Sequence, residues 1–215
     1  MILSLLASMI VKHGAIMVSN NLPITTEQLR AFSDLCGGRT KKVLVIHFDG
    51  GWVNDPQDQM ASLQHYGFRD LIGYQFENVE SGSNGYYAEL VAQVNGIVVV
   101  GHDDNSALRL CDRDLRQRIF GKFIERGGIM FGIGPGAIAV GDKMLIGNNP
   151  GPGLSIFDGI ITTDYYANHK EIHLRNAYFG SRLQLGIGLN RDEWLVFRDG
   201  VIEKKVGSPQ VFLRE

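Results

Sequence analysis

The sequence has few cysteines, no excess of either charge and no apolar run long enough to span a membrane. Its two cysteines, Cys36 and Cys111, are too few for a disulfide scaffold, which favours a reducing compartment such as the cytoplasm. Lys and Arg number 21 against 23 Asp and Glu, so the charge balance indicates no nucleic-acid partner. The apolar segment 1–11 is far shorter than the roughly 20 residues that cross a bilayer, so we expect no membrane partner.

The length and composition fit one domain. The chain has 215 residues, 44% of them hydrophobic, which is enough for one sizeable core and too little for two. We find no internal repeat, linker or low-complexity tract. We therefore expect a single domain over residues 1–215.

Apolar segments alternate with helical patterns through most of the chain. Continuous apolar runs at 42–48, 96–101 and 128–132 predict strands that are buried on both faces. Between such runs, segment 25–36 has apolar residues every three positions and predicts a helix, with Thr26 as its cap. This alternation predicts right-handed βαβ crossovers and a mostly parallel sheet.

The pattern changes after residue 160. Short strands separated by turns are predicted at 183–187, 194–198, 201–206 and 210–213, and Asp199-Gly200 is a hairpin signal. The predicted fold is an α/β three-layer sandwich with a mostly parallel central sheet, flanking helices and an antiparallel C-terminal edge.

One segment has the pattern of a catalytic turn. Gly132-Ile133-Gly134-Pro135-Gly136 follows a buried strand and matches the nucleophile elbow G-x-S-x-G, a sharp turn that exposes one side chain at the top of a sheet. Its flanking glycines are expected where strand and helix approach too closely for a Cβ. The central residue, Gly134, has no side chain to expose.

This turn resembles the G-T-S-A-G-A turn of the cyanophycinase and dipeptidase E family of serine peptidases, which have the class I glutamine-amidotransferase-like fold. Three further motifs follow the family's pattern. Residues 98–104 (VVVGHDD) resemble the family's strand ending in G-G-D-Q, and 159–165 (GIITTDY) resemble V-I-I-D-Q-H-F. Residues 186–191 (GIGLNR) resemble G-I-G-I-D-E. The resemblance covers about residues 14–213.

The resemblance implies that three catalytic positions have changed. It places Gly134 at the serine, Asp164 at the histidine and Arg191 at the acidic residue that orients the histidine. Serine hydrolysis needs an oxygen nucleophile, a base and a group that orients the base. We therefore expect no hydrolysis by the family mechanism, and we expect Asp164 and Arg191 to form an ion pair instead.

A binding cleft is expected beside the turn, because open α/β sheets bind ligands beyond the carboxyl ends of their strands. The expected ligand is a small peptide or an amino-acid-like molecule. The helix that begins after the turn is expected to favour a carboxylate or carbonyl oxygen at its N-terminus. The predicted ligand-binding residues are Gly101, His102, Asp103, Asp104, Gly134, Pro135 and Asp164.

Two other functions stay open. The chain can be an enzyme that uses His102, Asp103, Asp104 or Asp164 as acid–base groups in the same cleft. It can also be a structural or oligomerising protein, such as a homodimer, for which a filled apolar cleft would be the sign.

Other site signals are weaker, so we expect no cofactor and no metal. Residues 132–137 match the dinucleotide fingerprint G-x-G-x-x-A but lack the acidic residue expected after the next strand. His169 and His173 stand four apart, without a third metal ligand in view. Tyr165-Tyr166 fits a core position as well as a pocket wall.

Overall fold

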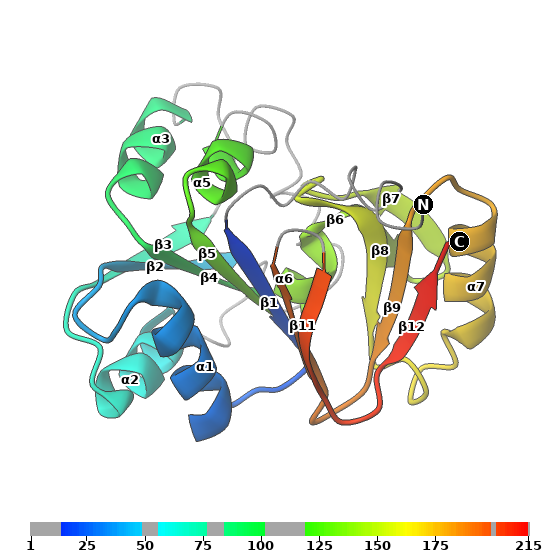
Figure 1. Ribbon diagram of the computed structural model, residues 1–215, viewed down its shortest axis with the longest axis horizontal. Helices are drawn as coiled ribbons and strands as arrows, with labels where there is room; N and C mark the ends of the chain where they lie inside the picture. Colours follow the sequence, from blue (N-terminus) through cyan, green and yellow to red (C-terminus); the bar gives the residue numbers. More distant parts are fainter. Residues whose placement is uncertain (1–13, 49–55, 77–83, 102–118, 199–200, 215) are drawn as a thin grey trace, which may run out of the picture.

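The computed structural model describes residues 14–48, 56–76, 84–101, 119–198 and 201–214 (Figure 1). Strands and helices alternate in the first half, and strands predominate in the second. The described elements are β1 (Ala15–Ser19), α1 (Thr26–Cys36), β2 (Val43–Phe48), α2 (Pro56–Tyr66), β3 (Leu71–Phe76), α3 (Asn84–Ala92), β4 (Gly96–Gly101), α5 (Gly121–Glu125), β5 (Ile129–Ile133), α6 (Pro135–Ala139), β6 (Gly141–Ile146), β7 (Asn149–Pro152), β8 (Phe157–Thr163), α7 (Glu171–Phe179), β9 (Leu185–Leu189), β10 (Trp194–Arg198), β11 (Val201–Val206) and β12 (Gln210–Leu213).

The strands form two sheets. Sheet A has the order β11-β10-β1-β5-β4-β2-β3, and sheet B has the order β12-β9-β8-β6-β7. In sheet A, β1, β5, β4, β2 and β3 are parallel, and β10 runs antiparallel to its neighbours β1 and β11. In sheet B, β6, β8 and β9 are parallel, with β7 and β12 antiparallel at the two edges. The α/β class, the mostly parallel strands and the antiparallel C-terminal strands are confirmed.

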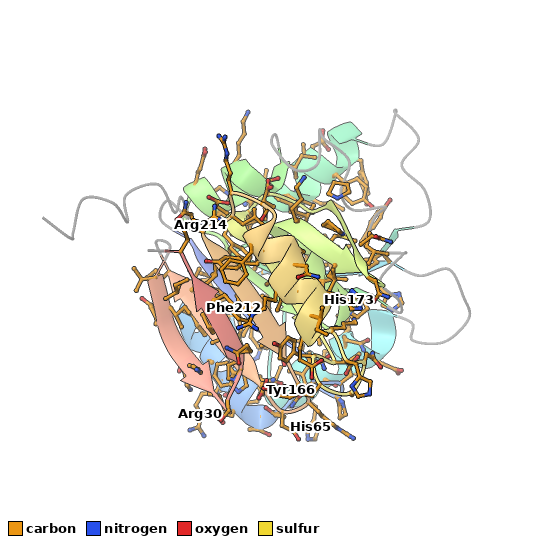
Figure 2. All side chains as sticks on the ribbon, turned by 90° about the vertical axis from the view of Figure 1, so that its right-hand side faces the viewer. Arg30, His65, Tyr166, His173, Phe212 and Arg214 are labelled. Atoms are coloured by element: carbon orange, nitrogen blue, oxygen red, sulfur yellow. The ribbon has the colours of Figure 1, made fainter. Side chains whose placement is uncertain are left out.

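Both faces of sheet A are covered. Along β1, Ile16 and Val18 belong to one hydrophobic core and Met17 belongs to another, and all three are fully buried. Because successive side chains of a strand point to opposite faces, an unbroken apolar run marks a strand that is covered on both sides. Helices α1 and α2 cover one face, and helices α3, α5 and α6 together with sheet B cover the other (Figure 1). Helix α7 lies across the outer face of sheet B (Figure 2).

Two segments differ from the sequence prediction. The cap of α1 is Thr25 and not Thr26: its side-chain oxygen accepts a hydrogen bond from the Gln28 N–H at 3.3 Å, and the Gln28 side chain accepts one from the Thr25 N–H at 2.9 Å. This capping box satisfies two backbone donors at the helix start. Residues 149–152, interpreted as a loop, form β7, whose two prolines are tolerated because it is an edge strand.

Some sequence predictions concern residues beyond the described ranges. The apolar segment 1–11, Cys111 and the Asp199-Gly200 turn all lie outside them. The strands on either side of that turn, β10 and β11, do pair antiparallel. Within the described part of the chain, no helix combines the length and the apolar character needed to cross a membrane.

Candidate functional site

The bend between β5 and α6 has the shape of a nucleophile elbow. β5 ends at Ile133, Gly134 follows with φ 55° and ψ −123°, and α6 begins at Pro135. A backbone of this kind is strained for residues with a side chain and suits glycine, and an elbow holds its central residue in such a turn. A Cβ placed on Gly134 would meet nothing within 4 Å. The crest of the bend therefore faces open space, and it lies where the sequence predicts it.

The flanking glycines allow the backbones of neighbouring elements to touch. A Cβ on Gly132 would lie 2.6 Å from the carbonyl oxygen of Gly136. A Cβ on Gly136 would lie 2.1 Å from the carbonyl oxygen of Val99 in β4. Both distances are too short for any real Cβ, because the neighbouring atoms are main-chain atoms that cannot rotate away. The main chains of β4, β5 and α6 are thus in direct contact and fix the position of Gly134.

An open pocket of about 310 Å³ lies at this bend. Its lining comes from loops and strand ends that are far apart in the sequence. The lining residues are Asn20, Leu22, Gly101, Gly134, Pro135, Asp164 and Arg191.

The pocket lies where the carboxyl ends of parallel strands from both sheets meet. From sheet A, Asn20 follows β1, Gly101 ends β4 and Gly134 follows β5. From sheet B, Asp164 follows β8 and Arg191 lies just beyond β9. Figure 1 shows the carboxyl ends of β1, β8 and β9 at the lower edge of the view. Open α/β sheets bind ligands at this edge.

Asp164 is held in place through both its backbone and its side chain. Its φ is 52°, in the left-handed region that few residues with a side chain adopt. Its carbonyl oxygen accepts a hydrogen bond from the Asn168 N–H at 2.9 Å, which closes the turn after β8. Its Oδ1 accepts one from Asn20 Nδ2 at 2.8 Å. Backbone strain of this kind concentrates at active sites and ligand clamps.

Arg191 lies in the loop after β9, which is tied to the end of β1. Asn21 Nδ2 donates to Asp192 Oδ1 at 3.0 Å, and the Asp192 N–H donates back to Asn21 Oδ1. Among the ion pairs of the described residues, none joins Asp164 to Arg191. The expected ion pair between them is therefore wrong, and Asp164 is hydrogen-bonded to Asn20 instead. The pocket presents a carboxylate and a guanidinium separately.

The backbone of the bend offers few free donors. The Gly134 N–H donates to the Ser19 carbonyl at 2.8 Å, and the Ala137 N–H donates to the Gly134 carbonyl at 2.9 Å. Pro135 has no N–H, although in an elbow the N–H after the central residue forms part of the oxyanion hole. Helix α6 has only five residues. The N–H groups of Gly134 and Ala137 are therefore engaged, and the expectation that this helix N-terminus favours a carboxylate or carbonyl oxygen stays a prediction.

Two solved structures resemble this chain over nearly its full length. The crystal structure of a peptidase from an acI-B1 actinobacterium matches with a TM-score of 0.62 at 18% identity, covering 97% of this chain and 89% of the other. A putative peptidase E protein from Listeria monocytogenes EGD-e matches with a TM-score of 0.60 at 13% identity, covering 94% of this chain and 99% of the other. The fold is peptidase E-like. No family model matches the chain, and no curated protein matches it either.

Within this peptidase E-like fold, part of the predicted site comes together. The predicted residues that line the pocket are Gly101, Gly134, Pro135 and Asp164. Those that lie outside the described residues are His102, Asp103 and Asp104. Sequence reasoning missed Asn20 and Leu22. The signal that could have found them is their position shortly after the apolar residues 15–18, at the sheet edge where the other site residues lie.

The weaker signals do not join this pocket. Cys36 is buried, and burial raises the pKa of its thiol to about 12, as fits a packing residue. Tyr165 is buried beside sheet B, whereas Tyr166 is exposed on the side that carries α7 (Figure 2). His169 precedes α7 and His173 lies within it, so they share no helix face. Over the described ranges, no group of three His, Cys, Asp or Glu side chains could hold a metal ion.

Proposed function

We propose that this chain binds a small peptide or an amino-acid-like ligand in the pocket at Gly134 and does not hydrolyse it by a serine mechanism. One observation carries the proposal. The bend keeps the shape of an elbow, yet Gly134 supplies no attacking oxygen and Pro135 supplies no N–H for the oxyanion. Acyl transfer by a serine mechanism needs the attacking oxygen, and loss of a single oxyanion donor lowers kcat by about a further 10²–10³ in a hydrolase.

The pocket itself supports the binding part of the proposal. Its volume of about 310 Å³ suits a molecule of the size of an amino acid or a short peptide. Its lining combines the apolar side chains of Leu22 and Pro135 with the charges of Asp164 and Arg191. Such a mixture fits a polar ligand with a small apolar part.

One rival function has a specific observation in its favour. Asp164 stands in the pocket on a strained backbone, so acid–base chemistry through its carboxylate is the second candidate. A purely structural role is less well supported, because the pocket is open and charged where a filled apolar cleft would be needed.

Binding and turnover have to be measured on the same sample to test the proposal. The purified chain would be incubated with β-aspartyl-arginine and with α-aspartyl dipeptides. Release of free amino acids would be followed by chromatography, and binding by ligand-observed NMR. We expect binding of at least one peptide and no release. Absence of binding to all of them would refute the proposed ligand class.

Two variants separate the rival mechanisms. Gly134→Ser restores a hydroxyl, and Gly134→Ser with Pro135→Ala restores a hydroxyl and an N–H. We expect neither variant to hydrolyse the peptides at a measurable rate, because the positions that the resemblance gives to the base and to its orienting group hold Asp164 and Arg191. Turnover by the unmodified chain that Asp164→Asn abolishes would establish the acid–base enzyme instead.

A further inference from the structure

The part of the pocket nearest the bend is rich in hydrogen-bond acceptors. Asn20 directs its amide nitrogen to Asp164 at 2.8 Å, so its Oδ1 is the group that stays available as an acceptor. Asp164 carries a second carboxylate oxygen beyond the one that Asn20 contacts. The Gly134 N–H is engaged with Ser19, and Pro135 has none. This region is therefore suited to a positively charged donor and not to an oxyanion.

Arg191 supplies the opposite charge from another loop. Its side chain is exposed and lines the same pocket. Within the described residues, no ion pair engages its guanidinium. Asn21 anchors the neighbouring residue, Asp192, so the loop that carries Arg191 has a fixed position relative to β1. A guanidinium in this setting fits a carboxylate, with which it can form two parallel hydrogen bonds.

We infer that the pocket recognises its ligand by two opposite charges, a primary ammonium group at Asp164 and Asn20 and a carboxylate at Arg191. This inference rests on the proposed function and narrows it. An ammonium group has three donors and no acceptor, which matches the oxygens of Asp164 and Asn20. The ligand class is thus a free amino acid or a short peptide with both termini unblocked. The polarity at the bend is the reverse of that needed to stabilise an oxyanion.

Three probes that differ by one charge at a time test the inference. They are alanyl-alanine, its N-acetyl derivative, which lacks the ammonium group, and its C-terminal amide, which lacks the carboxylate. Affinities would be measured by isothermal titration calorimetry or by NMR titration. We expect each blocked probe to bind about tenfold or more weakly than alanyl-alanine, because each loses a charge-assisted hydrogen-bonded contact.

Two variants assign each charge to its residue. Asp164→Asn should weaken binding of alanyl-alanine and of the amide about tenfold or more, and leave the affinity of the acetylated probe unchanged. Arg191→Gln should weaken binding of alanyl-alanine and of the acetylated probe, and leave that of the amide unchanged. The matched controls are Asp34→Asn and Arg175→Gln, which remove exposed charges outside the pocket. Thermal unfolding would verify that all four variants fold.

The outcomes separate this inference from the proposed function. If the chain binds alanyl-alanine but the two variants weaken all three probes alike, or none of them, the charge assignment is wrong and the binding function stands. If the chain binds none of the probes, the charge inference is refuted together with the proposed ligand class. If the chain cleaves alanyl-alanine, the noncatalytic proposal falls, and the charge assignment is still decided by the affinities of the two blocked probes.

Discussion

Replacing Gly136 by alanine tests the geometry on which the site depends. The added Cβ would lie 2.1 Å from the Val99 carbonyl oxygen, and ordinary contacts begin at 3.4 Å, so the overlap is 3.4 − 2.1 = 1.3 Å. The obstacle is the main chain of β4, an interior strand of sheet A, so it cannot move aside as a side chain would. We expect Gly136→Ala to lower the free energy of unfolding by more than about 3 kcal/mol, at or beyond the usual range for overpacking.

Two other glycines provide the controls. Gly134 and Gly147 have φ of 55° and 56°, and a Cβ on either would meet nothing within 4 Å. Alanine at each position should cost only about 1–2 kcal/mol, the strain of a side chain at positive φ. Urea unfolding followed by circular dichroism gives all three values. If Gly136→Ala costs no more than Gly134→Ala, β4 and α6 do not touch and the elbow geometry is wrong.

Three further predictions concern stability away from the pocket. Thr25→Ala should destabilise the chain by about 1 kcal/mol in urea unfolding through loss of the α1 cap, whereas Thr26→Ala should be nearly neutral. Arg126→Lys should cost about 2 kcal/mol in the same assay, because a lysine cannot reproduce the guanidinium contacts to three backbone carbonyls at the end of α3. Burial raises the pKa of Asp158, so the folded state holds its proton to higher pH than the unfolded chain, and this group lowers stability as the pH rises. Asp158→Asn should therefore raise the thermal unfolding temperature at neutral pH and leave it unchanged at about pH 2, below the ordinary Asp pKa of about 3.9.

Local signals in the sequence were sufficient for the buried strands of sheet A and for the bend. The apolar run 96–101 was predicted with its observed limits, because a strand buried on both faces leaves no room for polar residues. The bend was visible in Gly132 and Gly136, which mark positions where no Cβ fits. Both features depend on contacts that restrict the residue type directly, and such restrictions can be read from a single sequence.

Features that depend on tertiary arrangement were not predictable in the same way. Helix α7 was not predicted, because its mixed residues show no clear helical periodicity. The division of the strands into two sheets is set by which strands pair, and composition does not specify pairing. The contacts of the two pocket loops, Asn20 with Asp164 and Asn21 with Asp192, join residues 144 and 171 positions apart in the sequence. In the sequence, these two asparagines look like ordinary turn residues.

Glycine at the crest has a consequence for stability as well as for chemistry. An elbow with a serine holds a side chain at positive φ, a strain that a hydrolase needs in order to expose its nucleophile. A chain that does not use an attacking group avoids this strain, about 1–2 kcal/mol of folding free energy, by having glycine at the central position. Gly134, with φ 55°, occupies that position. The charged residues of the pocket, Asp164 and Arg191, lie on exposed loops. In the proposed function, the loops of sheet B with Asp164 and Arg191 recognise the ligand, and the bend from sheet A supplies no reactive side chain.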